Sequence, residues 1–396
     1  MLDAAMHAQL ESPFMSAPAE IRCAIYQHLV TSSSVHVFLT PQGRPQVSTC
    51  IVPPTSSLVA DWSRSMGGRQ PNNARENDPT WIRRVRTPWG PHWECEEAYL
   101  SHDLDDMTNL LSICKKMYLD VCTILFERAT INVTDLATLE LLTRNPAEEA
   151  PSPSHFWNLS NYAYPLIQRL SITLLLPLAV YEALADVQDN QPGREAQYAG
   201  EDATAVACAT WARACPAVCQ LPQLRNLHVW LDHDGGSSWS HVRERQAVGI
   251  GLMGVLAAHL QARSQDKKLP PVEVLFNLPK LHPALARPET HYVPESPPPL
   301  FAIERRFRLG SHVKEGAGGF LRVRHEYDFP ITRELALFNR YYDNPDDPDW
   351  DTGPVTEDEI REMEEYEKRL WEQGSDVHQY LKDITFSGLQ SQWAIL

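Results

Sequence analysis

The sequence has no long hydrophobic run. Its longest apolar stretch covers residues 174–180 and contains Pro177, whereas a membrane-spanning helix needs roughly 20 predominantly apolar residues. Residues 1–20 contain neither lysine nor arginine, and a secretory signal or an arginine-rich transit peptide needs such residues. We therefore expect neither a membrane span nor a targeting segment.

Basic residues are also scarce. The chain has 35 Lys and Arg against 51 Asp and Glu, which gives a formal net charge of −16. Nucleic-acid and anionic-membrane surfaces need clustered basic residues, and the basic cluster within residues 53–102 consists only of Arg83, Arg84 and Arg86. We therefore expect neither nucleic acid nor membrane as a partner. Residues 343–383 hold 15 acidic and 4 basic residues, so most of the charge belongs to the C-terminal part.

No CxxC pair occurs among the 8 cysteines. They are scattered through apolar helical patterns, which indicates reduced thiols in an intracellular protein, cytoplasmic or nuclear, rather than a disulfide framework. Cys208, Cys215 and Cys219 share one helix face. Packing as small apolar side chains is the interpretation we favour, and ligation of a soft metal is the alternative.

The common catalytic motifs are missing as well. There is no GxSxG elbow, no phosphate-binding GxxxxGK[ST] loop and no HExxH motif. The letters Gly249-x-Gly251-x-x-Gly254 spell a dinucleotide fingerprint, but a helical pattern precedes them where a strand is required. We interpret these glycines as small residues that let a helix approach a sheet, and we predict no cofactor.

Two groups of acidic residues invite a metal-site hypothesis. Asp347, Asp349 and Asp351 are spaced as in a calcium loop, but Thr352 stands where that loop needs glycine. Helix capping and a solvated linker explain the same residues, so we predict no metal site. His233 lies between two aspartates in residues 232–234, and such a cluster could also transfer protons.

What is present is an alternation of strands and helices. Residues 166–176, 224–231 and 272–278 read as strands, and helical patterns separate them. This order predicts an α/β (mixed α+β) protein with βαβ units and a parallel sheet. The uneven repeat suggests an irregular leucine-rich-repeat-like sheet, and an ordinary open α/β sheet is the alternative. Residues 301–309 and 320–329 are expected to form a C-terminal hairpin.

The chain divides into three parts by composition. Residues 13–145 are expected to hold two helical segments, a β-hairpin and a loosely ordered insertion at about 53–102. Residues 155–330 form the α/β repeat-like domain with its C-terminal β-hairpin, after a linker rich in proline and serine. Residues 331–396 form an acidic helical tail, in which Thr356 and Glu359 make a capping box.

Two short segments resemble a known family. Residues 17–29, APAEIRCAIYQHL, are similar to the opening of F-box-like domains, and residues 110–118, LLSICKKMY, followed by Leu125-Phe126, are similar to the segment that comes next. Both occur in a large family of filamentous-fungal proteins of unknown function. The resemblance implies a substrate adaptor of a cullin–RING ubiquitin ligase. The contact with the ligase adaptor subunit would come from Pro18, Ile21, Ile25 and Leu29, backed by Leu110, Leu111 and Cys114.

Two classes of function follow. The first is a protein-interaction module, with the F-box-like helices either bound to a ligase adaptor or serving only as the core of a larger domain. The second is an enzyme with a pocket at the carboxyl ends of the parallel strands, near residues 232–234 and Asn277. Since no catalytic constellation is evident, we favour the first. A closed setting around His233 would remove support for the second.

Overall fold

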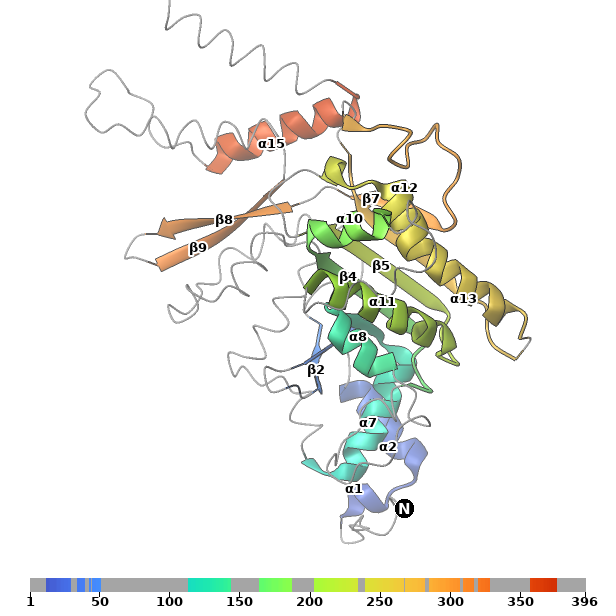
Figure 1. Cartoon of the computed structure of the whole chain (residues 1–396). Coiled ribbons are helices and arrows are strands. Elements are labelled where there is room, and N and C mark those ends of the chain that lie inside the picture. Colours follow the sequence, from blue (N-terminus) through green and yellow to red (C-terminus); the bar gives the residue numbers. More distant parts are fainter. Residues whose placement is uncertain are drawn as a thin grey trace, which may run out of the picture.

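A seven-stranded sheet runs through the protein, with three helices at one end and a long helix near the other (Figure 1). The computed structural model describes residues 12–29, 34–39, 43, 45–50, 113–143, 164–186, 203–233, 239–266, 268–281, 285–306, 309–316, 320–327 and 357–375. The predictions for the 53–102 insertion, Leu110 and Leu111, the basic cluster and the calcium-like loop lie outside these residues.

The strands of the large sheet are arranged almost in chain order. Their spatial order is β2 (Pro45–Thr49), β1 (Ser34–Leu39), β3 (Thr130–Val133), β4 (Arg169–Leu176), β5 (Asn226–His233), β6 (Glu273–Pro279) and β7 (Ala302–Arg306). Only β1 and β2 pair antiparallel, and every other neighbouring pair in this sheet is parallel. From β1 to β7 the order never reverses, so the sheet is singly wound. The predicted α/β class is confirmed.

The sheet crosses the boundary that composition suggested between residues 145 and 155. Ile131 of β3 lies opposite Leu170 of β4 in parallel register, and both side chains belong to one continuous buried cluster. The N-terminal segments and the α/β segments therefore share a sheet and a core.

One face of the sheet is covered by helices (Figure 1). These are α8 (Leu136–Thr143), α10 (Leu178–Asp186), α11 (Ala203–Gln220), α12 (Glu244–Gln246), the π-helical turn η6 (Ala247–Gly254) and α13 (Val255–Ser264). Ile172, Val229 and Phe276 lie side by side on neighbouring strands and are buried in the core cluster. Alternate residues along each strand thus supply the apolar layer.

The intervening residues give the opposite face a polar character. His36, Asn132, Ser171 and His228 follow one another across β1, β3, β4 and β5 in register. The amide of Asn132 donates to Ser34 Oγ at 2.5 Å and to the Val35 carbonyl at 3.0 Å. These hydrogen bonds satisfy a buried polar side chain that would otherwise be costly.

The C-terminal strands differ from the sequence prediction. Residues 301–309 were expected to form one strand of a hairpin, but they divide between β7, which joins the large sheet beside β6, and β8 (Leu309–Gly316). The hairpin pairs β8 with β9 (Phe320–Tyr327) as a separate two-stranded sheet. Strand propensity is continuous through this region, so the local sequence does not show where the pairing partner changes.

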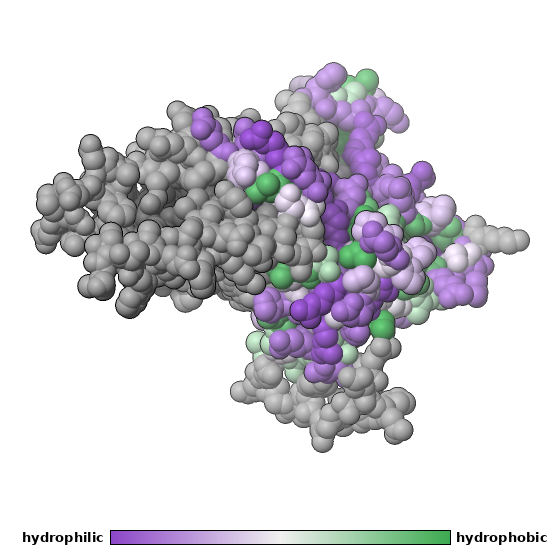
Figure 2. Space-filling view, turned by 90° about the horizontal axis from the view of Figure 1, so that it is seen from above, coloured by the Kyte–Doolittle hydropathy of each residue, from purple (hydrophilic) through white to green (hydrophobic). Residues whose placement is uncertain are grey.

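The acidic tail contains the helix α15 (Glu357–Glu372). Glu362, Glu365 and Glu372 are exposed on it, whereas Trp371 is buried. Figure 2 looks down on the molecule from above, and hydrophobic residues are scattered singly over the described surface seen from there. Such scattering is ordinary for a protein surface, so this view offers no apolar docking patch.

Candidate functional site

The helix α2 (Ala19–Leu29) buries a different face from the one its apolar stripe suggests. Arg22 and Tyr26 point inward, with 6% and 0% of their surface exposed. Ile21 and Ile25, at the same four-residue spacing, are 54% and 40% exposed. Pro18 precedes the helix and is exposed too. The Leu29 side chain lies outside the part that the structure describes.

Arg22 fixes this orientation. Its Nε donates to Asp120 Oδ2 of α7 (Lys115–Arg128) at 2.8 Å, and its Nη1 donates to the Ala17 carbonyl at 2.6 Å. The hydrogen bond to Asp120 raises the pKa of Arg22. Tyr26 packs edge-to-face on Phe14 with ring centroids 5.4 Å apart, and burial raises its pKa to about 12. A polar residue and an aromatic one therefore take the inner face and leave the isoleucines outside.

The neighbouring helices are joined by short polar contacts. Lys116 at the start of α7 donates to the carbonyl of Met15 in α1 (Pro13–Ser16) at 2.8 Å. Cys114 caps α7, because its Sγ accepts from the Met117 amide at 3.4 Å. Ile113 precedes this cap and is 61% exposed. The three helices α1, α2 and α7 thus form one unit at the end of the sheet (Figure 1), and several of its large apolar side chains face solvent.

The cluster around His233 is closed. His233 and Asp232 are both fully buried. The imidazole stacks on Trp239, with centroids 5.8 Å apart and planes 9° apart, and Tyr181 donates its hydroxyl to the Asp232 carbonyl at 2.9 Å. Asp234 lies outside the described residues. Within the part of the chain that the structure describes, His233 has no exposed surface, so the enzyme hypothesis loses its support at this place.

Asn277, the other residue of the enzyme hypothesis, is also fully buried. Its Oδ1 accepts from Arg306 Nε at 3.1 Å. The Arg306 guanidinium lies over the Trp230 ring, 4.9 Å from the centroid. The structure places Asn277 on the polar face of the sheet and His233 on the helix-covered face, since β5 and β6 alternate their side chains. The sheet does not bring the two together.

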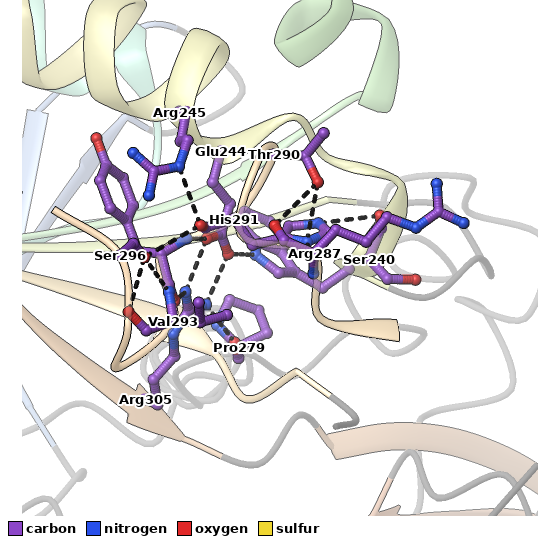
Figure 3. A network of polar contacts seen from close by, with 12 residues as sticks. Ser240, Glu244, Arg245, Pro279, Arg287, Thr290, His291, Val293, Ser296 and Arg305 are labelled. Carbon is purple, nitrogen blue, oxygen red and sulfur yellow. Dashed lines mark hydrogen bonds and ion pairs between the residues drawn. The ribbon is translucent and has the colours of Figure 1, made fainter. Parts of the chain in front are cut away.

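Trp239, which stacks on His233, also contacts a buried carboxylate that sequence reasoning missed, that of Glu244 (Figure 3). Glu244 at the start of α12 is fully buried and accepts from Trp239 Nε1 at 2.6 Å and from the Tyr292 amide at 3.0 Å. Arg305 of β7 clamps both of its oxygens, with N···O distances of 2.6 Å and 2.7 Å. In the sequence Glu244 looks like an ordinary surface residue of a helix, and only the fold brings Arg305 to it.

Two of the three glycines in the fingerprint-like motif, Gly249 and Gly251, allow close packing, whereas a Cβ at Gly254 would meet only the Gly249 carbonyl oxygen at 3.5 Å. A Cβ at Gly249 would lie 2.2 Å from the Tyr292 hydroxyl, and one at Gly251 would lie 2.9 Å from Leu184 Cβ. Gly249 and Gly251 therefore let η6 approach α10 and the segment after β6. This corrects the expectation that they face a sheet. No strand leads into them, and the geometry of a dinucleotide loop is not formed.

The three cysteines of α11 belong to the protein interior. Cys215 and Cys219 are buried, Cys208 is partly buried, and Cys219 Sγ lies 3.9 Å from the Leu256 carbonyl oxygen. Within the described ranges, no group of three or more His, Cys, Asp or Glu side chains could hold a metal ion. In the same ranges no helix combines the length and apolar character that crossing a membrane requires.

Comparison of the chain with family models, with curated proteins and with solved structures gives no match.

Proposed function

We propose that the chain is a protein-interaction module that docks a partner on the exposed face of α2, with Ile21 and Ile25 as the apolar anchors. The observation that carries the proposal is the exposure of both isoleucines on a helix whose opposite face is fixed by Arg22 and Tyr26. If the helices served only as a core, the apolar side chains would be expected inside. Burying an isoleucine fully contributes roughly 1.5–3 kcal/mol, so two anchors can dominate a small interface.

The partner that the family resemblance indicates is the adaptor subunit of a cullin–RING ubiquitin ligase. On this proposal the chain is an F-box-type substrate adaptor, and Pro18, which precedes α2, belongs to the same docking face. Leu29 is included on the strength of the resemblance alone. The rigid attachment of α2 supports this role, because a preorganised surface loses little conformational entropy on binding.

The test compares the purified chain with its variant Ile21→Asp/Ile25→Asp in binding to a purified ligase adaptor subunit. We expect binding by the natural sequence and none by the double variant, with both chains giving the same circular dichroism spectrum. A matched pair, Ile25→Asp against Gln27→Asp, places the same charge on the same helix, inside and outside the proposed face. Failure of the natural sequence to bind, or equal loss in both single variants, would contradict the proposal.

A further inference from the structure

The segment 285–301, which leads from β6 to β7, is held on the molecule by polar contacts (Figure 3). Arg245 of α12 donates its amide to the Thr290 carbonyl at 3.0 Å and its Nε to the Pro288 carbonyl at 2.6 Å. Arg305 also donates to the Tyr292 carbonyl at 2.7 Å. The segment therefore depends on a few hydrogen bonds, which gather around His291.

His291 is 1% exposed, and both of its ring nitrogens are engaged. Nδ1 accepts from the Arg287 amide at 3.0 Å and lies 3.1 Å from the Thr290 hydroxyl. Nε2 lies 3.1 Å from the Ser240 carbonyl, which can only accept. These partners require the neutral ring with its proton on Nε2. A second proton on Nδ1 would face the Arg287 N–H and break that hydrogen bond.

Charged groups from three elements surround the ring. Glu244 of α12 would attract an imidazolium, but both carboxylate oxygens already accept from Arg305, and Trp239 and Tyr292 add further donors. Arg305 of β7 and Arg287 of the segment itself repel a positive ring. Burial is the largest influence and lowers the pKa of His291 from its ordinary value of 6.5. The site thus favours the neutral form.

We propose that the segment 285–301 is an acid-operated latch: neutral His291 holds the segment closed on Ser240, and protonation of His291 releases it. Tyr292, the next residue, rests on Gly249 and its amide donates to Glu244. Release therefore removes one donor from Glu244, which also accepts from Trp239, the residue that stacks on His233. The latch is independent of the proposed docking through α2.

Closure of the segment 285–301 is expected to weaken as the pH falls, because the open and closed forms bind the His291 proton with different affinities. The open segment binds the proton more tightly than the closed one, because the pKa of His291 is lowered in the closed form. Closure is therefore fully favoured above pH 6.5 and weakens as the pH falls from 6.5 to the lowered pKa. Over that interval the open population rises about tenfold per pH unit, and below it the population levels off.

Hydrogen–deuterium exchange of the full chain between pH 7.5 and 4.5, corrected for intrinsic exchange rates, measures the opening. We expect the protection of residues 288–293 to stay constant above pH 6.5 and then to fall about tenfold per pH unit down to the lowered pKa of His291, while peptides from β4 and β5 keep their protection. In His291→Gln, whose amide can donate to Ser240 but does not titrate, the protection should not depend on pH. The control His241→Gln removes an exposed histidine close in sequence to Trp239, and it should respond like the natural chain.

Exchange of the histidine C2 proton, followed by mass spectrometry in the natural chain, gives the midpoint of His291 protonation without any substitution. We expect this midpoint to coincide with the midpoint of segment opening. The proposal is overturned if opening is independent of pH in the natural chain or equally pH-dependent in His291→Gln. It is overturned as well if the two midpoints differ, a result that remains decisive where the variant does not fold.

Discussion

An arginine–carboxylate ion pair holds a helix at each end of the sheet, but the surroundings of the two pairs differ. At the N-terminal end, Arg22 pairs with Asp120 to hold α2, and the isoleucines of that helix remain exposed. At the β7 end, Arg305 pairs with Glu244, and the surrounding aromatic side chains are enclosed. A buried arginine–carboxylate pair fixes a helix in both places. The difference lies in what surrounds the pair, which is a helix with an exposed apolar face in one case and an enclosed aromatic cluster in the other.

The largest loss of stability is expected at the β7 end of the sheet, where Glu244 and Arg305 pair. Glu244→Gln replaces one fully buried carboxylate oxygen, which accepts two hydrogen bonds, by an amide group that must face those donors, and breaking such a buried pair costs about 3–5 kcal/mol. Urea denaturation should show this loss in the free energy of unfolding. The exposed Glu289 lies in the segment 285–301, and Glu289→Gln should change little. Equal, small losses in both variants would mean that the Glu244 pair does not hold this end together.

A smaller loss of stability is expected from Arg22→Met at the N-terminal end of the sheet. Asp120 keeps 20% of its side chain exposed, so water can replace its lost partner, and the cost should be about 1–3 kcal/mol. The matched variant is Arg213→Met, because the Arg213–Glu140 pair is more exposed and should contribute at most about 1 kcal/mol. Urea denaturation of both variants tests whether Arg22→Met loses more stability than Arg213→Met. Arg22→Met should also weaken binding through α2 although both isoleucines remain.

The glycines of η6 offer a finer comparison. Gly251→Ala forces a methyl group against Leu184 and should destabilise the protein by about 1–2 kcal/mol. Gly254→Ala meets only the Gly249 carbonyl oxygen at 3.5 Å, and its gain in helix propensity should stabilise by up to about 1 kcal/mol. Thermal denaturation of the pair gives the sign of each effect. Equal shifts would show that packing against α10 does not select the glycine.

The smallest effect on stability is expected for Ile25→Asp. This side chain is 40% exposed, and substitutions at exposed positions usually change the free energy of unfolding by less than about 0.5 kcal/mol. Urea denaturation should therefore leave the variant close to the natural chain even though binding is lost. A loss of several kcal/mol would instead assign Ile25 to the core.

Much of the sheet could be predicted from the sequence because its signals are local. β4, β5 and β6 are apolar runs with helical patterns between them, and each was expected within a few residues of its observed bounds. The exposed face of α2 could not be predicted from its apolar stripe. Arg22 takes the inner face only because Asp120 is there, 98 residues away in the chain.

The contacts of Glu244 could be predicted from the sequence even less well than the orientation of α2. Arg305 lies 61 residues further along the chain than Glu244, and no spacing rule links the two. The π-helical turn η6 was likewise missed within the helical pattern expected between the strands at residues 224–231 and 272–278. Gly249 and Gly251 of this turn pack against Tyr292 and Leu184, which belong to other segments of the chain. Residues that meet only through the fold are the ones that sequence patterns do not reveal.

The chain-ordered sheet has a consequence for biosynthesis. Each strand pairs with its predecessor in the sheet, so β1, β3 and β4 can assemble while β6 and β7 have not yet been synthesised. Each parallel pair joins strands that lie tens of residues apart in the chain, and parallel sheets of this kind form slowly, but the N-terminal part of a nascent chain generally folds first. The growing sheet would then add parallel strands at one edge only, while β2 stays at the other edge, and β7 would be the last strand added.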